Sequence, residues 1–88
     1  MSVLLITYDL NHEVRRPRIV EAIKGQEGVK LSESSYAIST SSSPEQVYNW
    51  LRPMLDDNDH VYIVTLRKPW FGYGPQLTNE WLDRNLPN

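Results

Sequence analysis

Hydrophobic and polar positions along the chain predict four β-strands. These are residues 3–8, 29–32, 35–40 and 60–66. The first is an unbroken run of aliphatic, β-branched and aromatic side chains, which is typical of a central strand buried on both faces. In the third strand, Tyr36 and Ile38 are two positions apart and are therefore expected to share one face.

The segment between the first two strands has the spacing of a helix. Pro17 suits the first turn, where the missing N–H of proline costs nothing, and Gly25 and Gly28 end the pattern. The apolar stripe of this helix consists of Ile19, Val20 and Ile23.

A second helix is predicted after the third strand. Ser43, Pro44 and Gln46 have the spacing of a capping box with proline in the first turn. The side of the helix expected to be buried carries Val47, Trp50, Leu51, Met54 and Leu55. Pro53 predicts a kink or a shortened last turn, because proline lacks the N–H that a helix interior requires.

The chain after the fourth strand predicts a loop and a short helix. Residues 67–76 contain two prolines and two glycines among aromatic side chains, which is typical of an irregular loop. Thr78 is expected to cap the helix, with Leu77 packed against Leu82 as a hydrophobic staple. We expect Trp81 to join Trp50 in the core.

This order of elements predicts the fold. Strand, helix, strand, strand, helix, strand is the split βαβ arrangement of ferredoxin-like α+β proteins. We therefore expect a single domain over residues 1–88, with an antiparallel sheet, two helices on one of its faces and a short C-terminal helix.

Composition narrows the classes of protein. The chain of 88 residues contains no cysteine and has a formal net charge of −2, which argues against a general polyanion binder. No apolar stretch approaches the roughly 18 residues of a membrane helix, so we expect a soluble, cytoplasmic protein. A domain this small buries a limited fraction of its surface, and dimerisation is a common remedy.

Several segments resemble one family. Residues 4–11 (LLITYDLN), 21–24 (EAIK) and 51–59 (LRPMLDDND), with the loop around Trp70, resemble the SinR family of small bacterial and phage proteins. That family is similar in architecture to the CRISPR-associated small nuclease that accompanies the spacer integrase, and to virulence-associated protein D, a ribonuclease toxin. The resemblance implies a ferredoxin-like homodimer whose first strand ends in a Tyr-Asp pair, here Tyr8 and Asp9.

Asp9 is the main candidate for chemistry. By the resemblance, Asp9 and its symmetry mate would share one Mg²⁺ near the two-fold axis of a dimer and support the cleavage of a phosphodiester. The residues alone favour a turn that the Asp9 side chain caps. With the Tyr8-Asp9 match, both interpretations stay open. His12 is a candidate for proton transfer because it follows Asp9 closely. We expect His60 to be an exposed residue without a role.

Basic residues form two clusters in the sequence. Arg15, Arg16 and Arg18 lie at the start of the first helix, where the helix dipole opposes cations. Guanidinium groups bind phosphates in a bidentate manner, so these residues are candidates for binding nucleic acid, with Arg67 and Lys68 as the second cluster. The alternative is a solvated surface patch.

The aromatic loop has two possible uses. Trp70, Phe71 and Tyr73 could stack on unpaired bases or bury a dimer interface. We favour the interface, because exposed aromatic patches of this kind usually contact a partner.

Two functional hypotheses result. The first is a small homodimeric protein that acts on RNA or DNA, as a Mg²⁺-dependent endonuclease. The second is a non-catalytic dimeric interaction module that binds a protein partner, in phage–host conflict or in a toxin–antitoxin pair.

Overall fold

The computed structural model describes residues 1–10 and 16–88. Its elements are β1 (Ser2–Asp9), α1 (Arg16–Lys24), β2 (Gly28–Ser32), β3 (Ser35–Thr40), α2 (Pro44–Leu51), the 3₁₀ turn η1 (Arg52–Met54), β4 (His60–Leu66) and α3 (Gln76–Asn85). The predicted α+β order of strands and helices is confirmed. None of the helices in the described part of the chain has the length and apolar character needed to cross a membrane.

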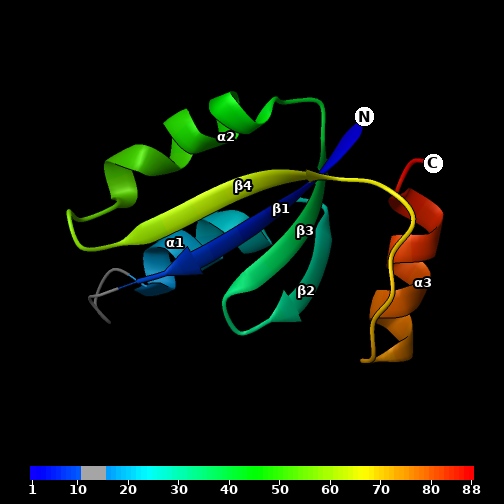
Figure 1. The fold of residues 1–88 in the computed structure, drawn as a ribbon. Coiled ribbons are helices and arrows are strands. Elements are labelled where there is room, and N and C mark those ends of the chain that lie inside the picture. The colour runs from blue at the N-terminus through cyan, green and yellow to red at the C-terminus, as the bar shows by residue number, and fades with distance from the viewer. Residues whose placement is uncertain (11–15) are drawn as a thin grey trace.

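The four strands form one antiparallel sheet in the order β2-β3-β1-β4 (Figure 1). The first strand is central, as its apolar sequence predicts, and pairs with β3 on one side and β4 on the other. Because β1 and β4 run antiparallel, the carboxyl end of β1 meets the amino end of β4, where Asp9 is paired with His60.

Helices α1 and α2 cover one face of this sheet. Their buried side chains form a single core with alternate residues of β1 and β3. This core contains Leu4, Ile6, Tyr8, Ile19, Ile23, Tyr36, Ile38, Val47 and Leu51. The spacing of Ile19 and Ile23 in α1, and of Val47 and Leu51 in α2, points both helices at the same layer.

Helix α3 packs on the other face, at one end of the molecule (Figure 1). A second cluster joins Trp81, Leu82 and Leu86 to Val3 of β1 and Ala37 of β3. Since Val3 and Ala37 alternate with the core positions Leu4 and Ile38, these side chains project from the opposite side of the sheet.

The predicted start and end of α2 are confirmed. Ser43 is the N-cap, its hydroxyl accepts a hydrogen bond from the Gln46 N–H at 3.1 Å, and the Gln46 side chain accepts from the Ser43 N–H at 2.8 Å. The α-helix stops at Leu51, and Pro53 lies in the 3₁₀ turn that follows. The shortened last turn expected from Pro53 is therefore present.

Three expectations about packing were wrong. Trp50 is 40% exposed, because it lies at the margin of the stripe formed by Val47 and Leu51 and not within it. Helix α3 begins at Gln76 after Pro75, so Thr78 lies inside the helix and does not cap it. Leu77 then belongs to the first turn, is 78% exposed and cannot form a staple from outside the helix.

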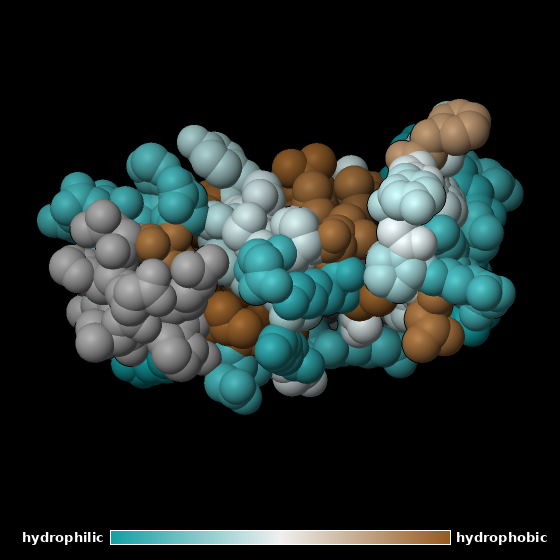
Figure 2. All heavy atoms as spheres, turned by 90° about the horizontal axis from the view of Figure 1, so that it is seen from below, coloured by the Kyte–Doolittle hydropathy of each residue, from teal (hydrophilic) through white to brown (hydrophobic). Residues whose placement is uncertain are grey.

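The face that carries α3 is only partly covered. On the half of this face that α3 leaves open, Tyr62 is 68% exposed and Val64 is 49% exposed. Figure 2 shows hydrophobic surface gathered in the middle of the molecule, with a further hydrophobic group projecting at the α3 end. Exposed aromatic and aliphatic side chains on one sheet face are typical of a contact surface.

Candidate functional site at the carboxyl end of strand β1

Asp9 is exposed at the last position of the central strand. Its neighbour across the sheet is His60, the first residue of β4, and the next pair on the same face is Thr7 with Tyr62. Residues directly opposite each other in an antiparallel pair have Cβ atoms about 5 Å apart and project to the same side. The strand pairing therefore brings a carboxylate, an imidazole and a phenol together on the uncovered face of the sheet.

These side chains line a shallow hollow of about 160 Å³. Its lining consists of Thr7, Tyr8, Asp9, His60 and Tyr62. A neighbouring hollow of about 290 Å³ shares His60 and Tyr62 and continues toward the loop before β4. The site is thus open, and it suits a group on the surface of a large molecule better than an enclosed small molecule.

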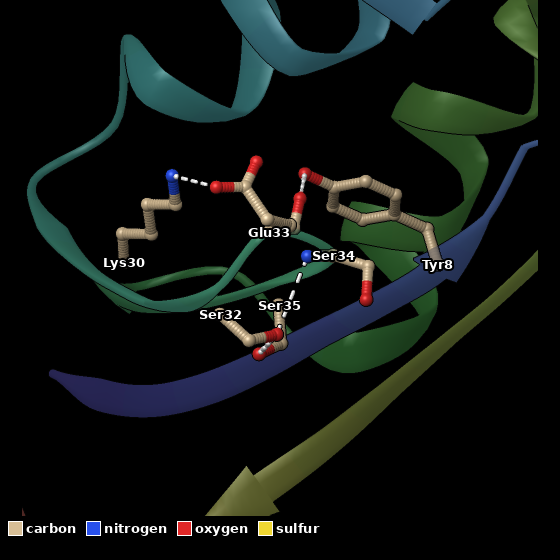
Figure 3. A network of polar contacts seen from close by, with 6 residues as sticks. All are labelled: Tyr8, Lys30, Ser32, Glu33, Ser34 and Ser35. Atoms are coloured by element: carbon tan, nitrogen blue, oxygen red, sulfur yellow. Dashed lines mark hydrogen bonds and ion pairs between the residues drawn. The ribbon is translucent and has the colours of Figure 1, made fainter. Parts of the chain in front are cut away.

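Hydrogen bonds hold the end of β1 in place from the turn between β2 and β3 (Figure 3). The Tyr8 hydroxyl donates to the Glu33 carbonyl oxygen at 3.2 Å, and the Tyr8 N–H donates to the Ser34 carbonyl oxygen at 3.0 Å. The same turn contains a Lys30–Glu33 ion pair at 3.1 Å. The end of β1 that carries Asp9 is consequently hydrogen-bonded to the β2–β3 turn on one side and paired with β4 on the other.

The same turn contains serine contacts. The hydroxyls of Ser32 and Ser35 lie 2.7 Å apart, and the Ser34 N–H donates to the Ser32 hydroxyl at 3.3 Å (Figure 3). These bonds close the turn on itself.

The loop before β4 is also ordered by a carboxylate. Asp59 is 8% exposed, and its side chain accepts a hydrogen bond from the Asp56 N–H at 2.8 Å. A carboxylate that binds a backbone N–H three residues earlier closes a tight loop. This loop leads directly into His60, so the buried Asp59 helps to position the histidine.

One protomer does not supply a complete metal site. Among residues 1–10 and 16–88, no three His, Cys, Asp or Glu side chains lie together as a metal-binding group. Asp9 and His60 are two neighbouring candidates. Mg²⁺ keeps several waters and is often held by one or two carboxylates with substrate phosphates, so the donor set would fit it if a second copy contributed its own Asp9.

The predicted basic clusters lie in different parts of the molecule. Arg18 is exposed on α1 and Arg16 begins that helix, whereas Arg15 and His12 lie outside the described residues. Arg67 and Lys68 follow β4, at the end of the sheet opposite to Asp9.

The second basic cluster is remote from the carboxylate. The seven residues of β4 separate His60 from Arg67, a distance of about 20 Å at the rise of a β-strand. Arg67 donates a hydrogen bond to the Asn88 carbonyl oxygen at 2.8 Å. Any phosphate contact of Arg67 and Lys68 would therefore be made far from the Asp9 site.

The aromatic loop divides into one anchored and two free side chains. The Trp70 indole is half-buried and donates a hydrogen bond to Asp83 of α3 at 3.1 Å. Phe71 and Tyr73 are fully exposed. Together with α3 and Leu31, the loop lines a hollow of about 350 Å³ at the end of the sheet away from Asp9.

His60 is exposed as expected, but its position opposite Asp9 was not predicted from local patterns, because His60 stands beside turn residues and in no motif. A signal was nevertheless present. If β1 and β4 are antiparallel neighbours, as a split βαβ order implies, the residue that ends the first strand must meet the residue that begins the fourth.

Comparison with known proteins leaves the site to be interpreted from its own geometry. No protein-family model matches this chain, and no solved structure gives a significant match.

Proposed function

We propose that this chain forms a ferredoxin-like homodimer that acts on RNA or DNA as a Mg²⁺-dependent endonuclease, with Asp9 at the site of cleavage. The fold assignment is supported by the strand order β2-β3-β1-β4 and by the shared face of α1 and α2. The resemblance of residues 4–11 to the SinR family, which is similar in architecture to a small CRISPR-associated nuclease and a ribonuclease toxin, supports the choice of nucleic acid as substrate.

The observation that carries the proposal is the position of Asp9. It is an exposed carboxylate at the end of the central strand, on the sheet face that α3 leaves open, and it lies beside an imidazole. If Asp9 only capped a turn, it would not require a histidine beside it.

A dimer would complete the site. The exposed side chains of Tyr62 and Val64 lie on the same face as Asp9, so a second copy that covers them would bring a second Asp9 close to the first. Mg²⁺ held between two carboxylates would neutralise charge on a phosphodiester and activate water. The protein's own part is to orient the phosphate and move protons.

Binding of the polymer would use local positive charge. Arg15, Arg16 and Arg18 are close to Asp9 in the sequence, and a dimer doubles the cluster. The net charge of −2 limits non-specific attraction, so affinity would depend on these few contacts and fall with increasing salt.

The test compares wild type with Asp9→Asn on labelled RNA and DNA, with Mg²⁺ and with a chelator. We expect cleavage by wild type that requires Mg²⁺ and is absent from Asp9→Asn. Asp57→Asn, which neutralises an exposed carboxylate of the neighbouring loop, is the matched control and should cleave at the wild-type rate. Undiminished cleavage by Asp9→Asn would refute the assignment of the site.

A second candidate function is favoured by the aromatic loop. Phe71 and Tyr73 are fully exposed, and side chains of this type often anchor a partner. In the alternative, the dimer is a non-catalytic module that captures a protein partner. Wild type would then cleave no substrate, and Phe71→Ala with Tyr73→Ala would abolish capture of the partner while Asp9→Asn would retain it.

A further inference from the structure

The hollow beside the aromatic loop differs in charge from the hollows near Asp9. It has a volume of about 350 Å³ and lies at the carboxyl end of β4, next to α3. The described residues that line it include one charged side chain, Arg67, and no carboxylate. The two hollows at the other end of β4 are both lined by aspartate side chains. The charge at the aromatic loop therefore suits an anionic ligand.

Two aromatic rings are available at this hollow. Phe71 and Tyr73 both line it, and both are fully exposed. Trp70, in contrast, is bonded to Asp83, and the backbone of Gly72 lies against its ring, because a Cβ atom on Gly72 would be 3.5 Å from that ring. Trp70 thus fixes the loop, and the rings of Phe71 and Tyr73 remain accessible. Accessible rings of this kind are surfaces on which unpaired bases stack.

Arg67 supplies the positive charge that a polynucleotide needs beside such rings. The residue is exposed, and its guanidinium donates a hydrogen bond to Asn88 at 2.8 Å. A guanidinium has five N–H donors, so this one bond leaves donors for a phosphate. Lys68 follows directly and adds a second cation. Cations beside exposed aromatic rings are the combination with which proteins bind single strands without reading their sequence.

We propose that the aromatic loop binds single-stranded RNA or DNA, with bases stacked on Phe71 and Tyr73 and a phosphate bound to Arg67. The inference rests on the proposed action on nucleic acid and adds the form of the substrate, a strand with unpaired bases. It assigns the two rings to the substrate, and not to the dimer contact that the sequence favours. The hollow is about 20 Å from Asp9 along β4, a distance that about six stacked nucleotides span.

The test measures binding in the presence of a chelator. Fluorescence anisotropy follows labelled oligouridine and oligodeoxythymidine of about 12 nucleotides, and a duplex of the same length. We expect wild type to bind the single strands more tightly than the duplex. Phe71→Ala combined with Tyr73→Ala should weaken single-strand binding by at least about fivefold, the lower limit for the loss of one stacked base. Leu77→Ala, at an exposed side chain of α3 that does not line the hollow, should bind as wild type.

Salt dependence tests the phosphate contact separately. Arg67→Gln should reduce the steepness with which the logarithm of affinity falls with the logarithm of salt concentration by about 0.7, the contribution of one phosphate on a single strand. Arg84→Gln removes an exposed cation of α3 that does not line the hollow, and should leave the slope unchanged. A wild-type slope for Arg67→Gln would overturn the phosphate contact. Thermal unfolding at the wild-type temperature shows that each variant is folded.

Binding and cleavage can fail independently. If wild type cleaves through Asp9 but the Phe71 and Tyr73 double variant binds single strands as tightly as wild type, the endonuclease proposal stands and this inference fails. Equal affinity for duplex and single strand also overturns it, because paired bases cannot stack on the rings. If wild type binds single strands through the loop but cleaves none, the endonuclease proposal fails and the binding site stands. A wild type that binds neither RNA nor DNA refutes both.

Discussion

Gly28, at the start of β2, lies so close to β3 that a side chain would collide with the neighbouring backbone. A Cβ atom there would meet the Ala37 carbonyl oxygen and the Ile38 Cα. Backbone atoms of a paired strand cannot move aside as a flexible side chain would. Glycine at this position is therefore required by the distance between two strands and not by an unusual backbone angle.

We predict that Gly28→Ala destabilises the protein by about 1–3 kcal/mol, the usual range for overpacking. Gly74→Ala is the matched control, since a Cβ there has nothing within 4 Å. Urea unfolding followed by circular dichroism measures both variants. Equal midpoints for the two would contradict the close approach of β2 to β3.

Single residues also mark where sequence patterns stop being informative. The apolar spacing of Val47 and Leu51 identified the buried side of α2 correctly, whereas Trp50 was placed in the core on its size and apolar character alone. Whether a side chain beside the apolar stripe is buried depends on how the helix is rotated against the sheet. The sequence of the helix alone does not reveal this rotation. Leu77 was misplaced for another reason, because α3 begins before it, at Gln76.

At the scale of elements, α2 depends on a cap and a stop that are both local. Ser43 and Gln46 satisfy backbone donors at its amino end, and Pro53 prevents the α-helix from continuing beyond its carboxyl end. Both features of α2 are encoded within four or five residues and were predictable from the sequence for this reason. The pairing of Asp9 with His60 involves residues 51 positions apart, and so it required the order of strands in the sheet.

Removal of the cap should weaken α2 by a measurable amount. We predict that Ser43→Ala lowers the free energy of unfolding by about 1 kcal/mol, within the range seen for N-cap serines. Ser41→Ala, at an exposed serine two residues earlier, should change it little. Thermal or urea unfolding measures the stability of the two variants. A Ser43→Ala protein with the wild-type free energy of unfolding would mean that the capping box contributes nothing to stability.

At the scale of the whole molecule, the sheet has unequal faces. One is covered by α1 and α2, and the other is covered by α3 at one end alone. The sequence of β4 alternates between half-buried and exposed positions, with Tyr62 and Val64 exposed on the open side. A face of this composition is the natural contact between two copies in the dimer that we propose.

We predict that Val64→Arg converts the proposed dimer to a monomer, because a charge would be buried in the contact without a partner. Tyr48→Arg, at a similarly exposed position on α2, should leave the dimer intact. Sedimentation velocity measures the mass of each variant. A wild type that sediments as a monomer at high concentration would refute the dimer, and a dimeric Val64→Arg would place its contact elsewhere.

The attachment of α3 has an optical consequence. Of the three tryptophans in the chain, Trp81 belongs to α3 and is buried against the sheet, and Trp70 is hydrogen-bonded to α3 through Asp83. The third, Trp50, lies on α2, so a Trp50→Phe protein would emit fluorescence from the α3 layer alone. A red shift of that emission, without loss of the far-ultraviolet signal of the sheet, would report that α3 leaves the sheet before the rest of the domain unfolds.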